Sequence, residues 1–95
     1  MGSTSDESKM SKAKETLEEF GIEYEWKVLS AHRNPDKVVN LVSTARENGF
    51  VAFICGAGMA AHLAGVVAAH TTLPVVGVPL SGGALNGQDA LYATV

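Results

Sequence analysis

The chain has 95 residues, 46% of them apolar and 18% charged, and seven basic against ten acidic side chains give a net charge of −3. Its basic residues are not clustered, which argues against nucleic-acid binding, because that function needs grouped cations facing phosphates. No stretch approaches the 18 apolar residues of a membrane-crossing helix, and the first residues lack the basic and apolar parts of a secretory signal.

The first two predicted elements are a helix and a strand. Apolar residues recur at helical spacing from about Glu7 to Phe20, and Gly21 supplies a stop. Tyr24, Trp26 and Val28 then alternate with polar neighbours, a pattern that favours a strand with one side less fully covered.

The next part of the chain predicts a second helix and a buried strand. Asn34 can cap a helix whose first residue is Pro35, and Gly49 would end it. The wholly apolar run from Phe50 to Cys55 is typical of a strand buried on both faces, and a glycine turn follows it at 56–58.

The last part repeats the alternation. We expect a helix of small residues from about Ala60 to Ala69, a strand at 75–78 closed by Pro79, and a final helix from about Gln88. Helices and strands that alternate in this way predict an α/β fold, in which a parallel sheet carries helices on both faces.

The whole chain, residues 1–95, reads as one partial α/β domain. Only Met1 precedes the opening glycine–serine loop, where such a fold has a strand, and the sequence stops inside a helical pattern. We therefore expect the central part of a larger catalytic domain, without its first strand and its carboxyl-terminal part. The single cysteine, Cys55, has no internal disulfide partner, which favours a reducing, cytoplasmic location.

Polar residues gather in the loops expected at one edge of this sheet. Ligands of open parallel sheets bind beyond the carboxyl ends of the strands. Four loops lie there: 2–6, 30–34, 56–59 and 79–86. This edge is the candidate site.

The opening loop has the chemistry of an anion site. It precedes a helix, whose free N–H groups and dipole favour negative charge, and Ser3 and Ser5 add hydroxyl donors. Asp6 could accept a hydrogen bond from a ribose hydroxyl. The alternative is a plain capping loop, with Ser5 or Asp6 as the cap.

The second loop, Ser30-Ala31-His32-Arg33, offers a proton carrier and a phosphate ligand. Histidine gains or loses a proton near neutral pH, and the arginine fork matches phosphate oxygens. The alternative is a solvated loop histidine beside a surface arginine.

The third loop resembles part of a dinucleotide fingerprint but lacks its third glycine and its downstream acid. Close approach of a ligand or another subunit to its backbone is the inference that remains. His62 is about as consistent with a structural role as with ligand contact, and Cys55, in an apolar run, favours a buried inert thiol over a nucleophile. No spacing of ligand residues fits a metal site.

Taken together and in order, these motifs resemble a known family. They are Gly2-Ser3-Thr4-Ser5-Asp6, Ser30-Ala31-His32-Arg33 with Pro35, Gly56-Ala57-Gly58 through Ala60-Ala61-His62-Leu63, Gly77-Val78-Pro79, and Leu85-Asn86-Gly87 with Asp89 and Leu91-Tyr92. The chain is similar over its length to the 5-(carboxyamino)imidazole ribonucleotide mutases of purine biosynthesis, the catalytic subunits of phosphoribosylaminoimidazole carboxylase.

The resemblance implies a flavodoxin-like, three-layer fold and a homo-octamer with active sites at subunit contacts. It implies an isomerase that moves a carboxylate from the exocyclic amine of a phosphoribosyl aminoimidazole to ring carbon 4, without ATP, metal or organic cofactor. His32 would be the catalytic proton carrier. The implied substrate-binding residues are Ser3, Ser5, Asp6, Ser30, Ala31, Arg33, Gly56, Ala57, Gly58, His62 and Leu63.

The sequence departs from the family pattern at two positions and leaves rival functions open. Met59 stands where the family usually has glycine, and Ala64 where it usually has proline. Arg33 and His62 favour the mutase over the related carboxylases that use free carbon dioxide. The rivals are such a carboxylase, a non-catalytic phosphate- or nucleotide-binding module, and a chain that is inactive because it cannot assemble.

Overall fold

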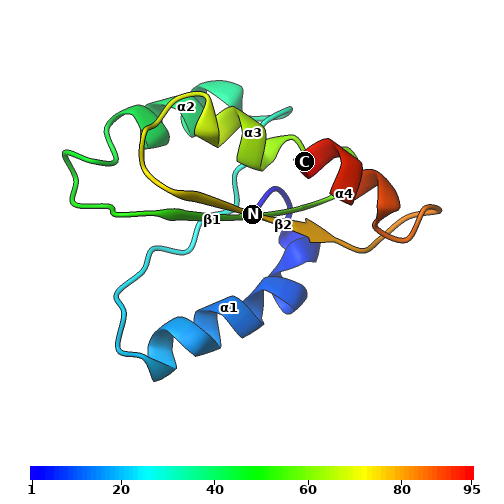
Figure 1. The fold of residues 1–95 in the computed structure, drawn as a ribbon, viewed down its shortest axis with the longest axis horizontal. Coiled ribbons are helices and arrows are strands. Elements are labelled where there is room, and N and C mark those ends of the chain that lie inside the picture. Colours follow the sequence, from blue (N-terminus) through cyan, green and yellow to red (C-terminus); the bar gives the residue numbers. More distant parts are fainter.

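The structure, a computed structural model, describes residues 1–95 and has four α-helices around a short parallel sheet (Figure 1). In chain order the elements are a 3₁₀ turn at Thr4–Asp6, α1 Glu7–Glu19, α2 Pro35–Ser43, β1 Phe53–Gly58, α3 Leu63–Ala68, β2 Val75–Leu80 and α4 Gln88–Thr94. None of these helices is long and apolar enough to cross a membrane.

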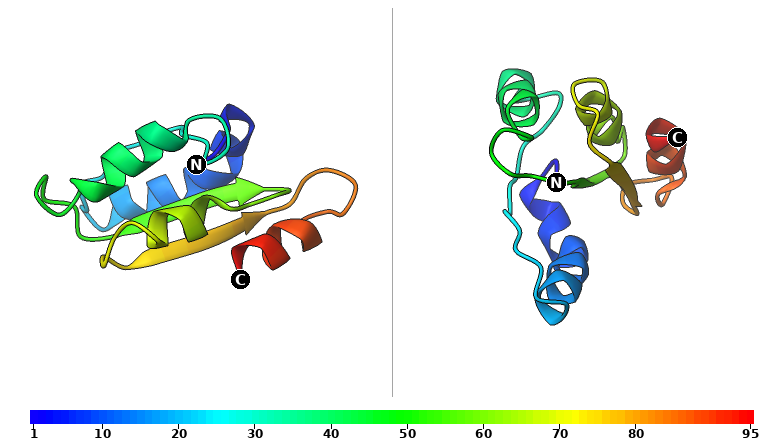
Figure 2. Two further views of the ribbon diagram at one scale, coloured as in Figure 1. Left: turned by 90° about the horizontal axis from the view of Figure 1, so that it is seen from above. Right: turned by 60° about the vertical axis from the view of Figure 1, so that its left-hand side comes forward.

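The elements form three layers. Helices α2, α3 and α4 lie on one face of the sheet and α1 lies alone on the other (Figures 1 and 2). The β1 and β2 strands pair in parallel, with Phe53 opposite Val75 and Gly58 opposite Leu80. The predicted α/β class is therefore confirmed, in an incomplete form with two strands.

The main core lies between the sheet and helices α2 and α3. It consists of Val38, Val42, Cys55, Leu63, Ala64 and Val67, all of them buried. The apolar spacing in α2 and the small residues of α3 place these side chains on the faces that meet the sheet.

Alternate residues of β1 point to opposite faces of the sheet. On the face covered by α1, the absence of a side chain at Gly56 leaves room for the helix. A Cβ atom at Gly56 would lie 2.3 Å from Met10 Sδ, so the glycine lets Met10 of α1 rest directly on the strand. Packing of α1 against β1 thus depends on the missing side chain.

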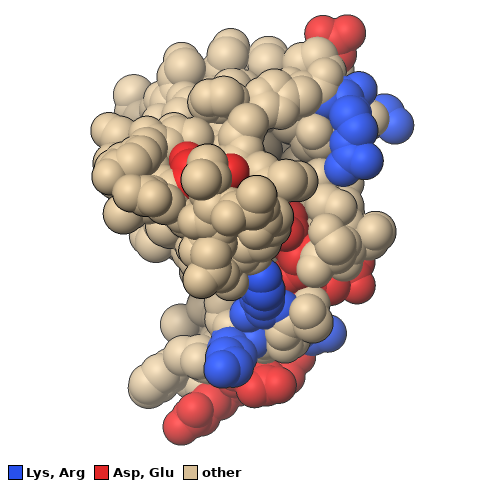
Figure 3. Space-filling view, turned by 90° about the vertical axis from the view of Figure 1, so that its right-hand side faces the viewer, with Lys and Arg blue, Asp and Glu red and all other residues tan.

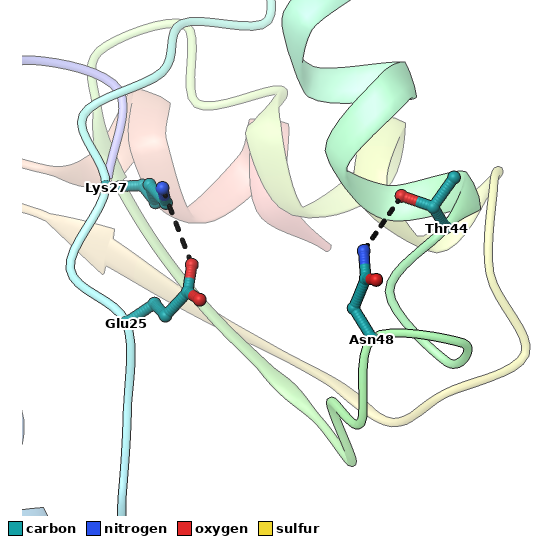
Figure 4. A network of polar contacts seen from close by, with 4 residues as sticks. All are labelled: Glu25, Lys27, Thr44 and Asn48. Atoms are coloured by element: carbon teal, nitrogen blue, oxygen red, sulfur yellow. Dashed lines mark hydrogen bonds and ion pairs between the residues drawn. The ribbon is translucent and has the colours of Figure 1, made fainter.

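The strand predicted at 24–28 is the main error of the sequence analysis, since the structure has no strand there. Tyr24 and Trp26 are half-buried between exposed neighbours, and Val28 is half-buried beside the exposed Lys27, so the alternating pattern itself is present. The side chains of Glu25 and Lys27 lie on the same side and form an ion pair of 3.4 Å (Figure 4), as residues i and i+2 of an extended chain do. A strand also needs a paired neighbour, and here only Met1 provides one.

Met1 makes both hydrogen bonds of a parallel pair with this segment. Its amino nitrogen donates to the Lys27 carbonyl at 2.9 Å, and its carbonyl accepts from the Leu29 N–H at 2.8 Å. On the other side, the Gly2 N–H donates to the Gly56 carbonyl at 3.1 Å. Met1 and Gly2 therefore connect segment 24–29 to β1.

Two predicted boundaries shift for local reasons. Helix α2 ends at Ser43 rather than near Gly49, because residues 44–49 form turns in which the Asn48 side chain donates to Thr44 Oγ1 at 3.4 Å (Figure 4). The expected helix at 60–69 begins only at Leu63.

Strand boundaries shift too. The β1 strand runs through the predicted glycine turn to Gly58, because β2 continues beside it to Leu80. Pro79 lies within β2 instead of closing it. Although proline has no N–H group to donate, Pro79 still stands opposite Ala57 in the parallel register.

Substitution of Gly77 tests the packing of β2. A Cβ atom there would lie 2.6 Å from Thr94 Cγ2 and 3.2 Å from Ala64 Cβ. We expect Gly77→Ala to lower the free energy of unfolding by about 1–3 kcal/mol, as overpacking does. Denaturant titration measures it. The control, Gly65→Ala, adds a methyl group in open space on α3 and should stabilise by up to about 1 kcal/mol. Equal effects of the two substitutions would contradict this packing.

Candidate functional site

Three of the four loops predicted at the sheet edge meet around a polar cavity of about 410 Å³, whereas no residue of the fourth, 79–86, lines it. It is lined by the opening loop, the loop before α2 and the loop between β1 and α3. Its lining residues are Gly2, Ser3, Ser5, Asp6, Ser30, Ala31, His32, Arg33, Ala57, Gly58, Met59, Ala60, His62 and Leu63. A slightly larger cavity of about 450 Å³ lies elsewhere and is lined mostly by hydrophobic residues, whereas serine, histidine, aspartate and arginine side chains surround the first, which is therefore the candidate for chemistry.

The opening loop is organised by Ser3. Its side-chain oxygen accepts from the Ser5 N–H at 3.4 Å and from the Ser5 hydroxyl at 3.0 Å, which makes Ser3 the cap of the 3₁₀ turn. Of the two caps that the sequence offered, Asp6 holds the N-cap position of α1, although its side chain makes no capping bond, and Ser5 caps neither element. The Asp6 carboxylate remains available to a ligand.

Gly58 leaves space beside that carboxylate. A Cβ atom at Gly58 would lie 4.0 Å from Asp6 Oδ1 and 3.4 Å from the Leu80 carbonyl oxygen. The bare backbone at the end of β1 therefore forms part of the cavity wall next to Asp6.

The second loop is built on Ser30, a buried polar residue. Its hydroxyl oxygen accepts from the backbone N–H groups of His32 at 3.2 Å and Arg33 at 3.1 Å, while Asn34 Oδ1 accepts from the Ser30 N–H at 3.4 Å. These bonds curl the loop so that His32 and Arg33 emerge beside the cavity. In this structure the Ser30 hydroxyl holds the loop.

Arg33 reaches across to the opening loop. Its Nη2 atom donates to the Gly2 carbonyl at 2.8 Å, and its side chain is exposed. Guanidinium has five N–H donors in a fixed fork, so this bond leaves donors for an anion at the cavity.

His32 and His62 lie in contact, although the sequence separates them by 30 residues. His32 Nε2 is 2.9 Å from His62 Nδ1, and the ring planes meet at 80°. One of these nitrogens carries the shared proton and the other accepts it. The sequence analysis selected both residues but gave no sign that they form a pair.

Two site features follow from the backbone. Gly56, expected to line the site, lies outside the cavity, where its carbonyl accepts from Gly2 and Met10 covers its Cα. Met59 lines the cavity with a left-handed φ of 50°, a conformation that favours glycine and costs other residues about 1 kcal/mol or more. This geometry suits the glycine that the family resemblance implies at that position.

Cys55 takes no part in the site. It is buried in the core with side chains of α2 and α3, and desolvation raises the pKa of its thiol to about 11. A thiol so rarely ionised near neutral pH is a poor nucleophile, as the apolar sequence around it indicates.

Figure 3 shows how charged side chains are distributed over one face of the molecule. On the face in Figure 3 blue and red side chains are interspersed, mostly over the lower part where α1 lies, and no broad positive area is seen.

Removal of the Ser30 hydroxyl tests the construction of the second loop. We expect Ser30→Ala to leave two N–H groups without acceptors and to lower the free energy of unfolding by about 1–3 kcal/mol. Ser43→Ala removes an exposed hydroxyl that donates to the Val39 carbonyl and should change stability by less than about 0.5 kcal/mol. Thermal unfolding of both variants is the measurement. A Ser30→Ala variant as stable as the unsubstituted chain would contradict this role of the hydroxyl.

Comparison with known proteins identifies the family of the chain. The family described as AIR carboxylase matches residues 1–95. The chain is 54% identical over all its 95 residues to proteins from Vibrio vulnificus and Bacillus subtilis, both named N5-carboxyaminoimidazole ribonucleotide mutase. It is 52% identical to the phosphoribosylaminoimidazole carboxylase of Schizosaccharomyces pombe, of which it covers 17%. It spans 59% of the length of the two bacterial relatives. The chain belongs to the AIR carboxylase family.

Proposed function

We propose that this chain carries the substrate site of an N5-carboxyaminoimidazole ribonucleotide mutase of purine biosynthesis. The observation that carries the proposal is the meeting of His32, Arg33, Ser3 and Asp6 around one cavity, from two loops that are distant in sequence. The bacterial relatives that share more than half of the sequence bear that name.

The substrate offers a phosphate and a ribose away from the reacting ring. The Arg33 fork and the serine hydroxyls of the opening loop can donate to the phosphate oxygens, while the Asp6 carboxylate can accept from ribose hydroxyls. Binding energy gathered from these distant groups orients the imidazole without taking part in the chemistry. Ala31, Ala57, Gly58 and Leu63 supply the less polar part of the wall.

The proposed reaction has two steps and one proton carrier. In the first, the bond between the exocyclic nitrogen and the carboxylate breaks, carbon dioxide leaves, and protonated His32 gives its proton to that nitrogen. In the second, ring carbon 4 attacks carbon dioxide and His32 removes the proton from that carbon. Atoms and charge balance over the cycle, and the histidine returns to its starting state.

Contact with His62 gives His32 a partner for this exchange. Because His62 Nδ1 faces His32 Nε2 at 2.9 Å, it can hold the ring in one orientation as the proton comes and goes. Such a second histidine is well placed to act as a positioning residue.

A carboxylase that joins free carbon dioxide to aminoimidazole ribonucleotide is the second candidate, favoured by the name of the fission-yeast relative. The two activities differ in the substrate consumed. Conversion of the carboxyamino compound without added bicarbonate supports the mutase, whereas turnover that requires aminoimidazole ribonucleotide with bicarbonate supports the carboxylase.

We further propose that the whole protein works in the cytoplasm as a homo-octamer. Support comes from exposed apolar side chains on the sheet, such as Ile54 and Val76, which lie opposite each other in register and are 41% and 53% exposed. Sedimentation analysis tests the assembly, and a monomer at micromolar concentration would count against it.

Substitution of His32 tests the chemistry. We expect His32→Asn to lower turnover by about 10²–10⁴-fold, because the proton carrier is lost, with little change in substrate affinity. The assay uses this chain grafted in place of the matching segment of the Bacillus subtilis relative. His70→Asn, which alters an exposed histidine bonded to the Val66 carbonyl, is the matched control and should keep full activity. Near-normal turnover of His32→Asn would disprove the assignment.

Substitution of Arg33 tests the phosphate contact. Lysine keeps the charge but loses the fork and its bond to the Gly2 carbonyl, so we expect Arg33→Lys to raise KM about tenfold or more, with a smaller effect on kcat. Arg46→Lys is the control, because Arg46 bonds Thr72 away from the cavity. A kcat effect without a KM effect would show that Arg33 does not hold the phosphate.

A further inference from the structure

Met59 differs from the other residues that line the polar cavity in the strain of its backbone. Its φ of 50° is left-handed, and Asn86 is the one other non-glycine residue with a positive φ. Met59 is also 59% exposed, so burial of its own side chain offsets little of that strain. A strained residue in the wall of a binding site points to a role for its side chain there.

The side chain of Met59 lies against the loop between β2 and α4. A Cβ atom at Gly83 in that loop would lie 3.3 Å from Met59 Sδ and 3.4 Å from Met59 Cγ, so the thioether rests on bare glycine backbone. A Cβ atom at the neighbouring Gly82 would meet nothing within 4 Å. Because no residue of this loop lines the polar cavity, Met59 stands between the cavity and the open space over the two glycines.

The loop that supports Met59 is held at both of its ends. Lys9 Nζ, from α1, donates to the Ser81 carbonyl and, at 3.3 Å, to the Ser81 hydroxyl. A Cβ atom at Gly87 would lie 3.1 Å from Ser81 Cα, so the two ends of the loop are in contact. The methionine side chain therefore rests on an anchored support.

Met59 also lies on the wall that leads from the ribose end of the proposed ligand to its base. Gly58, beside Asp6 Oδ1, comes directly before it, and His62, in contact with His32, follows three residues later. With the ribose at Asp6 and the reacting imidazole at His32, the Met59 side chain borders the base.

We propose that Met59 is a specificity-determining residue, which restricts the site to ribonucleotide monophosphates with a single-ring base. Imidazole and purine ribonucleotides share the phosphate, the ribose and a five-membered ring, so the contacts to phosphate and ribose do not distinguish them. The second ring of a purine needs room that the Met59 side chain occupies, and a steric block of this kind selects by excluding the wrong ligand. The inference rests on the proposed function.

The size of the cavity makes a single side chain decisive. Its volume of about 410 Å³ is near the lower end of the range for small-molecule sites, about 300–1,000 Å³. Without the Met59 side chain, the cavity would join the open space over Gly82 and Gly83.

Substitution of Met59 by glycine tests the block. Glycine suits the left-handed φ, so Met59→Gly should be at least as stable as the unsubstituted chain. Calorimetric titrations with aminoimidazole ribonucleotide and with inosine 5′-monophosphate give the two dissociation constants. We expect Met59→Gly to bind inosine monophosphate about tenfold or more tightly than the unsubstituted chain does, with less than about a threefold change for aminoimidazole ribonucleotide.

Two control variants separate the block from a general loss of apolar surface. Met59→Leu keeps a side chain of similar volume and should exclude inosine monophosphate as the unsubstituted chain does. Leu85→Ala shortens a side chain of the supporting loop that is also 59% exposed but does not line the cavity, and it should change neither constant. Thermal unfolding shows that each variant is folded.

The outcomes for this inference and for the proposed function are distinct. Failure of aminoimidazole ribonucleotide to bind the unsubstituted chain would count against the proposed function itself. When that ligand does bind, three results would overturn the role of Met59. They are unchanged binding of inosine monophosphate to a folded Met59→Gly variant, an equal gain in Met59→Leu, and equally tight binding of both ligands to the unsubstituted chain.

Discussion

Two adjacent residues, Met1 and Gly2, make the backbone hydrogen bonds on which the site depends. Met1 binds the segment before Ser30, and Gly2 binds the end of β1. The Gly2 carbonyl also receives the Arg33 side chain. These bonds hold the opening loop, the His32 loop and the end of β1 side by side. Without them the three segments that line the polar cavity would not be held together.

The bonds act on loops that are already shaped by their own residues. Ser3 closes the opening turn with its hydroxyl oxygen, and Ser30 closes the second turn in the same way. Side-chain acceptors of this kind satisfy N–H groups that no helix or sheet can reach. The loops are thus preorganised, and the energy of ligand binding is not spent on ordering them.

Much of this arrangement could be predicted from the sequence because the signals are local. Helical spacing located α1, and Asn34-Pro35 marked the start of α2. The rule that parallel strands end at one edge predicted that four loops would lie together, and three of them line the cavity. The structure places all but one of the selected site residues around the cavity, and whether they bind substrate is left to experiment.

The misses arise where partners outside the local sequence decide the outcome. Alternation at Tyr24–Val28 is correct for a strand, but a strand exists only when a neighbour pairs with it. The contact of His32 with His62 depends on where the loop before α3 lies, which no spacing in the sequence reveals.

The central claim is that three loops form one site for a phosphoribosyl aminoimidazole. Its most direct measurement is a nitrogen-15 NMR titration of the labelled chain with aminoimidazole ribonucleotide. The account predicts shifts of the amide signals at residues 3–6, of His32 and Arg33, and of Gly58, all saturating together. Saturable shifts confined to α4, or no shifts at millimolar ligand, would contradict it.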